Sequence, residues 1–323
     1  MTTPMDYTKT DAQAYARQHF TGAWAATLTP FRPGDGGVDW AGFDRNLDHW
    51  IGGLGIDGLF VTGKQGEFFS MSLAERKRSF EAAAAAVRGR ARTVMSCSDT
   101  NLDVVIELAR HAQQVGADWI VVHSPVLHFG ADTDETIYEY YRHLSEVLDI
   151  GIAMWNHPDC GYQMSPRLCA RIAELPNIVA IKYSVPRPLY AELTRLVGDR
   201  IQVSNPSEED WLDNIAELGW RLYLCSTPPM LLQTAADCRI HDYTRAAFAG
   251  DLAGARAIRD SLQPVRDAFK ACKPHGKPQA HAKAWQECLG QVGGPVRRPL
   301  LQLTDAEHAL VREQFALSGL KAS

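Results

Sequence analysis

Short runs of β-branched and aromatic residues recur along the chain from residue 23 onward, separated by stretches with helical spacing. Eight of these runs are almost continuously apolar, which is typical of parallel strands that are buried on both faces. None of them reads as a polar edge strand, so the pattern favours a closed sheet. The predicted strands cover residues 23–29, 58–62, 92–97, 119–124, 151–156, 178–184, 201–205 and 221–226.

The segments between the predicted strands carry the signals of amphipathic helices. Ser72 and Glu75 are spaced as a capping box, and Ser165 before Pro166 is typical of an N-cap and a first helical residue. Eight apolar strands that alternate with helices predict an α/β fold, a (β/α)8 TIM barrel. An open doubly wound sheet is the alternative, but the chain has neither a glycine-rich dinucleotide motif after the first strand nor a P-loop.

The strand pattern ends near residue 240, and the remaining sequence has helical spacing, with a last helix from about Asp305. We therefore predict an N-terminal extension over residues 1–20, the barrel over residues 21–239 and a C-terminal helical appendage over residues 240–323.

Composition narrows the classes of partner. The 323 residues carry a formal net charge of −5, without a block of like charges that would favour nucleic acid. No apolar run is long enough to cross a membrane and the polar start lacks the core of a signal peptide, so we expect a cytoplasmic protein. The seven cysteines are scattered without zinc-binding spacing, which favours reduced, packed thiols and predicts no metal site. Small molecules or further copies of the chain are the expected partners.

One lysine interrupts the apolar pattern, at the end of the sixth predicted strand. In a (β/α)8 barrel the carboxyl ends of the strands carry the chemistry, and alternation places Ile178, Ala180 and Lys182 on one face. Burial there disfavours an ammonium, and the neutral amine is a nucleophile toward carbonyl carbons. Alternatively, Lys182 reaches water at the strand end or pairs with a carboxylate.

The second predicted strand ends in the turn GKQGE, residues 63–67. Its glycines permit a close backbone approach, so the turn can aim amide groups, Lys64 and Gln65 at an anion such as a carboxylate. Most turns of this kind are only turns, and the motif alone is weak.

The fifth predicted strand ends in WNHP, with Trp155 at the mouth of the barrel, where it either contacts substrate or caps the core. His128 and His157 lie in loops after the fourth and fifth strands. They are candidate proton shuttles, although such residues are more often ordinary surface groups.

Taken together, these features resemble the dihydrodipicolinate synthase/N-acetylneuraminate lyase family of Schiff-base lyases, from about Gly22 to the final helices. The resemblance rests on LTPF at residues 28–31, GKQGE in the place of Gly-Thr-Thr-Gly-Glu, WNHP in the place of Tyr-Asn-x-Pro, and the strand that ends in Ile-Lys. It implies a barrel with C-terminal helices, a homotetramer built as a dimer of dimers, and no metal or organic cofactor. The family lysine condenses with the ketone of pyruvate or another 2-oxo acid, and Lys182 matches its position.

The chain departs from the family at its proton relay. The tyrosine that serves as general acid/base falls at Trp155, the two threonines of the turn fall at Lys64 and Gln65, and a further tyrosine falls at Leu127. The arginine with which the lysine-biosynthetic members bind a second carboxylate falls at Cys160. The resemblance therefore favours a lyase other than the lysine-biosynthetic synthase.

Two functions remain open at this stage. The first is a lyase, an aldolase or dehydratase of 2-oxo acids, whose protons move through water, His128, His157 or the substrate. Its substrate would contact the strand ends at Lys64, Gln65, Trp155, Leu127, His128, Ser207, Glu208 and Leu224.

Within the lyase function, the adjacent Glu208 and Glu209 favour a polyhydroxylated or cationic tail, unless they only stabilise the first turn of a helix. Alternatively, Phe68, Phe69 and Phe129 allow an aromatic aldehyde partner, because hydratase-aldolases of arylidene pyruvates share the Lys-Tyr pair seen at residues 182–183. The second function is that of a sensor or binding protein that has lost the chemistry and binds a 2-oxo acid or related carboxylate.

Overall fold

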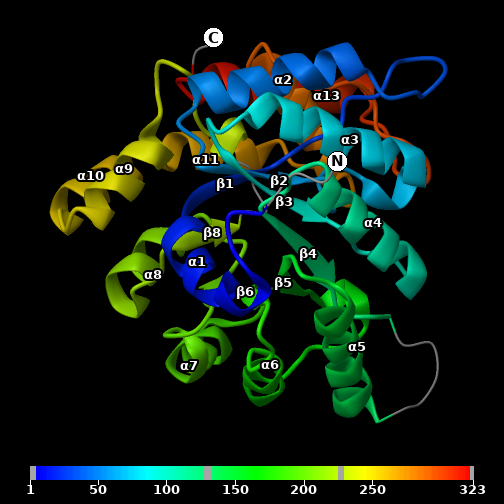
Figure 1. Cartoon of the computed structure of the whole chain (residues 1–323). Helices are drawn as coiled ribbons and strands as arrows, with labels where there is room; N and C mark the ends of the chain where they lie inside the picture. Colours follow the sequence, from blue (N-terminus) through cyan, green and yellow to red (C-terminus); the bar gives the residue numbers. More distant parts are fainter. Residues whose placement is uncertain (1–4, 127–131, 225–228, 321–323) are drawn as a thin grey trace. The chain divides into compact units, whose positions relative to one another are not determined.

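A computed structural model describes residues 5–126, 132–224 and 229–320 (Figure 1). The chain forms two compact units, the first made of residues 1–22 and 92–224 and the second of residues 23–91 and 225–323. The boundaries predicted at residues 20 and 239 remain a proposal for how the chain is organised.

Eight parallel strands alternate with helices and are followed by a C-terminal set of helices. This is a (β/α)8 barrel fold, and the predicted fold class is confirmed. In the first unit the order is β7-β6-β5-β4-β3, and in the second unit β1 pairs with β2. The strands are β1 Gly22–Ala26, β2 Gly58–Val61, β3 Arg92–Ser96, β4 Trp119–His123, β5 Gly151–Asn156, β6 Ile178–Tyr183, β7 Gln202–Ser204 and β8 Leu222–Leu224.

The strands of the first unit form its core. Every residue of β5 and β6 is buried, as the near-continuous apolar sequence predicts. The register pairs His123 with Trp155, Trp155 with Lys182 and Lys182 with Ser204, so four neighbouring strands bring one residue each to the same level. The helical segments of this unit are η1 Lys9–Asp11, α1 Ala12–His19, α4 Leu102–Gln114, α5 Thr133–Val147, η3 Pro158–Cys160, α6 Pro166–Ile172, α7 Arg187–Val197 and α8 Trp211–Leu218.

The N-terminal extension is helical and packs against β5 and β6 (Figure 1). Gln13 donates hydrogen bonds from Nε2 to the carbonyl oxygens of Ala173, Leu175 and Ile178, at the start of β6. The hydroxyl of Tyr7 accepts a hydrogen bond from the amide of Gly151, the first residue of β5. These contacts lie at the amino ends of the strands, away from Lys182 at the carboxyl end of β6.

The second unit contains β1, β2 and the C-terminal helices. The helical stretch predicted after residue 240 divides into three helices, because Gly250 has a positive φ and Asp251 caps the next helix. The predicted capping box of Ser72 and Glu75 is present, and the last helix starts at Asp305 as expected. The helices are α2 Trp40–Gly53, η2 Phe68–Ser70, α3 Leu73–Val87, η4 Pro229–Leu231, α9 Arg239–Phe248, α10 Leu252–Ser261, α11 Gln263–Ala271, α12 Pro278–Cys288 and α13 Asp305–Leu317.

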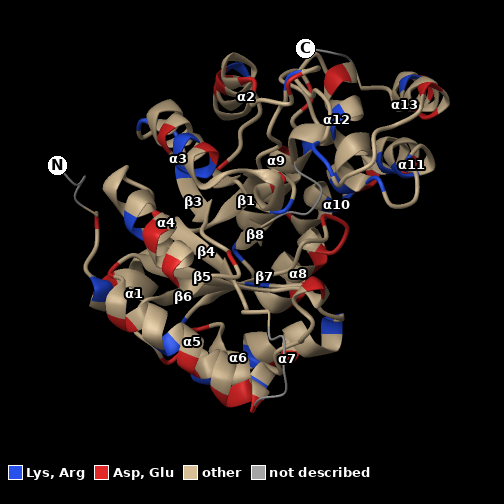
Figure 2. Cartoon of the chain, turned by 90° about the vertical axis from the view of Figure 1, so that its right-hand side faces the viewer, with Lys and Arg blue, Asp and Glu red and all other residues tan. Residues whose placement is uncertain are grey.

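None of the helices within the described ranges is long and apolar enough to cross a membrane. In Figure 2, the acidic and basic residues of the first unit lie mostly on its helices. The sequences of β4, β5 and β6 contain a single Lys, Arg, Asp or Glu, which is Lys182.

Candidate functional site

Lys182 lies at the carboxyl end of β6 and is only 3% exposed. Its neighbour Tyr183 turns the other way and donates a hydrogen bond from its hydroxyl to the carbonyl of Met164, which precedes α6. The alternation predicted from the sequence therefore holds at this strand end, and the burial of Lys182 argues against the alternative in which it reaches water.

Trp155 is the immediate neighbour of Lys182 in the adjacent strand. The Nζ atom of Lys182 lies 5.0 Å from the centroid of the Trp155 ring, a cation–π distance. The indole is 2% exposed and belongs to the strand end as well as to the core. This burial fits the interpretation in which Trp155 caps the core, and its contact with substrate stays a prediction.

A histidine that the sequence interpretation missed lies on the other side of Trp155 in the strand order. The ring of His123, the last residue of β4, lies 3.8 Å from that of Trp155, centroid to centroid. Its Nδ1 lies 2.8 Å from Sγ of the buried Cys160. The position of His123 on the face of Trp119 and Val121 was readable from alternation, but its pairing with Trp155 was not.

The carboxyl ends of β7 and β8 complete this face of the first unit. Ser204, which pairs with Lys182, accepts a hydrogen bond on Oγ from the amide of Leu224 at 2.8 Å. Leu224, the last residue of β8, is fully buried, and its contact with substrate stays a prediction. Two residues after Lys182, the buried hydroxyl of Ser184 has no hydrogen-bond partner within the described ranges, which leaves it available to a ligand.

The residues predicted after β7 separate into two environments. Glu208 is 5% exposed, whereas Glu209 is exposed. The backbone amide of Ser207 donates a hydrogen bond to Oδ1 of Asn205. The side-chain Nδ2 of Asn205 in turn donates to the carboxylate of Asp210, the N-cap of α8. Of the two adjacent carboxylates, only Glu208 is enclosed by the protein. The prediction that they favour a polyhydroxylated or cationic tail stays a prediction.

The other loop candidates fare differently. His157 accepts a hydrogen bond on Nδ1 from the amide of Asp159 and caps the short helix η3, so the structure gives it a local structural contact. Leu127, His128 and Phe129 lie outside the described residues.

The GKQGE turn lies in the second unit, where it follows β2. Thr62, just before the turn, and Glu67, its last residue, have φ angles of 55° and 60°, unusual for non-glycine residues and strained for a β-branched one. A Cβ atom on Gly66 would lie 2.9 Å from the carbonyl oxygen of Thr27, so this position requires glycine. Lys64 and Gln65, the second and third residues of this constrained turn, are half-buried.

Glu67 anchors the turn to the C-terminal helices of the same unit. Its carboxylate, fully buried, contacts Nζ of Lys283 on α12 at 2.5 Å and accepts a hydrogen bond from the amide of Arg297 at 2.9 Å. The pKa of Lys283 is lowered to about 8 because burial disfavours its charge, against the opposing effect of Glu67. The sequence motif thus ends in a buried ion pair rather than in a solvated carboxylate.

A profile of the Dihydrodipicolinate synthetase family matches residues 19–316, almost the whole chain. The chain belongs to this family. Curated relatives include the 4-hydroxy-tetrahydrodipicolinate synthase of Nitrobacter hamburgensis, 29% identical over 308 residues that cover 94% of this chain and 99% of the relative. The enzyme of the same name from Afipia carboxidovorans is 26% identical over 307 residues, covering 94% and 99%. The crystal structure of dihydrodipicolinate synthase from Aquifex aeolicus has a TM-score of 0.79 at 25% identity, covering 93% and 99%.

Membership of the dihydrodipicolinate synthetase family places the protein among small-molecule enzymes that include Schiff-base lyases. Among the described residues, no group of three or more His, Cys, Asp or Glu side chains is arranged as a metal site would require.

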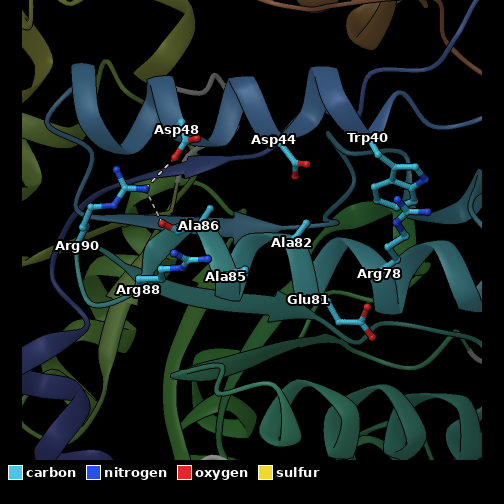
Figure 3. A pocket seen from close by; sticks show the side chains of 10 residues that line it. All are labelled: Trp40, Asp44, Asp48, Arg78, Glu81, Ala82, Ala85, Ala86, Arg88 and Arg90. Atoms are coloured by element: carbon cyan, nitrogen blue, oxygen red, sulfur yellow. Dashed lines mark hydrogen bonds and ion pairs between the residues drawn. The ribbon is translucent and has the colours of Figure 1, made fainter.

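A surface pocket of about 520 Å³ in this family member lies between α2 and α3 of the second unit (Figure 3). Arg90 spans its edge and pairs with Asp48 at 2.8 Å. None of the residues predicted to bind substrate lines it. The pocket lies on the helical layer and not at a strand end, so we do not assign it to the chemistry.

Proposed function

We propose that the protein is a class I aldolase-like lyase that forms a Schiff base between Lys182 and the ketone of pyruvate or another 2-oxo acid. The observation that carries the proposal is the burial of the Lys182 amine at the carboxyl end of β6, against the ring of Trp155. A lysine held at such a position is costly to retain unless the amine is used. The lyases of the family supply the class of reaction.

The chemistry follows from the amine. A neutral amine adds to the ketone carbon, and loss of water gives an imine that is protonated on nitrogen. The protonated imine withdraws electrons from the neighbouring carbon, so a carbon–carbon or carbon–oxygen bond further along the substrate can break. In this proposal Lys64 and Gln65 bind the carboxylate of the 2-oxo acid, as their positions in the family turn suggest.

The curated relatives are named as synthases, and the proposal separates this chain from them on two substitutions. Trp155 stands where the family carries a tyrosine, and its indole donates a hydrogen bond without exchanging protons. Cys160 stands in the place of the carboxylate-binding arginine, and its Sγ contacts Nδ1 of His123. We therefore expect no formation of 4-hydroxy-tetrahydrodipicolinate under conditions in which the Nitrobacter hamburgensis relative forms it.

The position of Trp155 also supports a second candidate function, a 2-oxo acid sensor or binding protein without turnover. A third candidate, the hydratase-aldolase of arylidene pyruvates, has less support. Tyr183 donates its hydrogen bond to the carbonyl of Met164 on the opposite face of β6 from Lys182. The Lys-Tyr sequence pair therefore does not by itself bring a phenol to the amine.

Trapping with borohydride tests the proposed function. The protein is incubated with pyruvate and a panel of 2-oxo acids, reduced, and examined by intact mass, with Lys182→Ala as the control. A reduced adduct on the wild type and none on the variant is expected, and no adduct from any member of the panel would sink the proposal. An adduct without cleavage or dehydration of any panel substrate would favour the binding protein.

The resemblance to the family also supports a homotetramer, a dimer of dimers, with a cytoplasmic location. Light scattering after size-exclusion chromatography tests the first proposal, with a mass near four times that of the chain expected.

A further inference from the structure

The proposed Schiff-base chemistry needs a group that accepts and returns a proton beside Lys182. Trp155, which fills the neighbouring position in β5, does not exchange protons near neutral pH. The proton then moves through another group at the same strand ends, through water or through the substrate itself.

His123 has the required chemistry and the required place. Imidazole exchanges protons near neutral pH more readily than any other side chain. The strand register puts His123, Trp155 and Lys182 at one level on three adjacent strands. The rings of His123 and Trp155 are 3.8 Å apart, and Nζ of Lys182 is 5.0 Å from the Trp155 ring.

Cys160 fixes the orientation of this imidazole. Its Sγ lies 2.8 Å from Nδ1, and the backbone amide of His123 donates to Oγ of Ser98 at 3.0 Å. With Nδ1 engaged by the thiol, Nε2 is the nitrogen that can face a ligand. A contact at the second nitrogen restricts the angle of the imidazole ring, and acid–base catalysis requires such a fixed orientation.

The other candidates in the described part of the first unit fit less well. His157 lies beyond the end of β5, where it caps η3, and its side chain is 27% exposed. Burial raises the pKa of Tyr140 far above its ordinary value, and nearby Asp99 and Cys160 add to this effect. Its phenol therefore gives up a proton reluctantly.

We propose that His123 is the acid–base residue of the reaction, and that it moves the proton at C3 of the 2-oxo acid bound to Lys182. Nε2 takes the proton from C3, the C3–H electron pair becomes the C2=C3 double bond of an enamine, and the C=N π pair returns to nitrogen. The imidazolium that results returns a proton to C3, where the C2=C3 pair forms the new C3–H bond and the protonated imine is restored. This inference rests on the proposed function, since it assigns a step of the Schiff base at Lys182.

Exchange of the methyl protons of pyruvate in D2O reports this step without knowledge of the natural substrate. Proton NMR follows the exchange, and borohydride trapping follows the Schiff base in parallel. The wild type should show both. His123→Gln should keep the adduct and lower the exchange rate by about 100-fold or more, the size of an acid–base contribution. The exposed His19, on α1 of the same unit, gives a matched control, because His19→Gln should change neither readout.

Cys160 is a positioning residue in this scheme and provides a second set of variants. Cys160→Ala should lower exchange by about tenfold while the adduct persists, as for the removal of a supporting contact. Cys160→Ser, which keeps a hydrogen-bonding group beside Nδ1, should restore most of the rate. If Cys160 had a purely structural role, Cys160→Ser would not restore the exchange rate while the yield of adduct stayed unchanged.

The two proposals fail in different ways. A wild type without any adduct overturns the Schiff base and the role of His123 together. A wild type that forms the adduct, combined with a folded His123→Gln that exchanges at the wild-type rate, overturns His123 alone. A wild type that forms the adduct but does not exchange the methyl protons also overturns the role of His123. The same holds if His157→Gln loses the exchange while His123→Gln keeps it.

Discussion

The Nζ atom of Lys283 lies 2.5 Å from Oε1 of Glu67, and the two side chains are 1% and 0% exposed. Lys283 also donates a hydrogen bond to the carbonyl of Pro295, and its ammonium lies over the ring of Phe31. Lys283→Met would leave the Glu67 carboxylate buried without its counter-charge. We expect a loss of about 3–5 kcal/mol in the free energy of unfolding, measured by urea denaturation.

Two further variants sharpen this prediction. In the combined variant Glu67→Gln/Lys283→Met no charge remains buried, so most of the lost stability should return. Lys277→Met removes a comparable but partly exposed pair with Glu307 and should cost no more than about 1 kcal/mol. Equal losses from Lys283→Met and Lys277→Met would contradict the importance of burial.

His281 predicts a pH dependence of stability in the second unit. Its side chain is fully buried, and burial lowers its pKa to about 4 from an ordinary value of 6.5. Between these two values the unfolded chain binds a proton that the folded chain does not, so stability falls as the pH drops from about 6.5 to about 4. In His281→Gln, the melting temperature should vary less with pH between about 6.5 and about 4.

The exposed His275 supplies the control for this measurement, because His275→Gln should leave the pH profile of the wild type unchanged. A melting temperature that does not change between pH 6.5 and pH 4 in the wild type would refute the assignment to His281.

Trp155→Phe tests what the indole does beside Lys182. Phenylalanine keeps an aromatic ring but loses area and the indole N–H, so we expect KM for the 2-oxo acid to rise several-fold. Because Trp155 moves no proton in the proposed mechanism, kcat should change by less than about threefold. Steady-state kinetics on a substrate found in the panel gives both constants. A collapse of kcat at unchanged KM would instead assign chemistry to the indole.

Lys64→Met tests the predicted carboxylate contact of the GKQGE turn. Loss of a charged hydrogen-bond donor should raise KM for the 2-oxo acid by about 10- to 100-fold, while the yield of the trapped adduct at saturating substrate stays high. The exposed Lys273 of the same unit offers a matched control, and Lys273→Met should leave KM as it is. An unchanged KM in Lys64→Met would remove this residue from the site.

Much of the fold was predictable because its signals are local. The apolar runs marked all eight strands within a few residues, and the capping residues Ser72 and Ser165 marked helix starts. Lys182 was conspicuous because a charged residue in an apolar strand breaks the pattern. The division of the stretch after residue 240 was missed because Gly250 and Asp251 act through backbone conformation, which helical spacing does not record.

The site was less predictable because its contacts join distant segments. His123 ends its strand as any polar residue does, and only the register of β4 with β5 puts it beside Trp155. Cys160 lies 37 residues from its partner His123 along the chain, and Lys283 lies 216 residues from its partner Glu67. Glu208 and Glu209 look alike in sequence, but the turn before α8 buries the first and exposes the second.

The common level of His123, Trp155, Lys182 and Ser204 on four successive strands has a consequence for how such enzymes diverge. Each strand has one side-chain position at the level of the Lys182 amine. A barrel of this kind can therefore transfer its proton-handling group from one strand to its neighbour by point substitutions while the nucleophile stays in place. With His123 in the proposed role, a comparison that follows only position 155 would record a loss where the chemistry had moved by one strand.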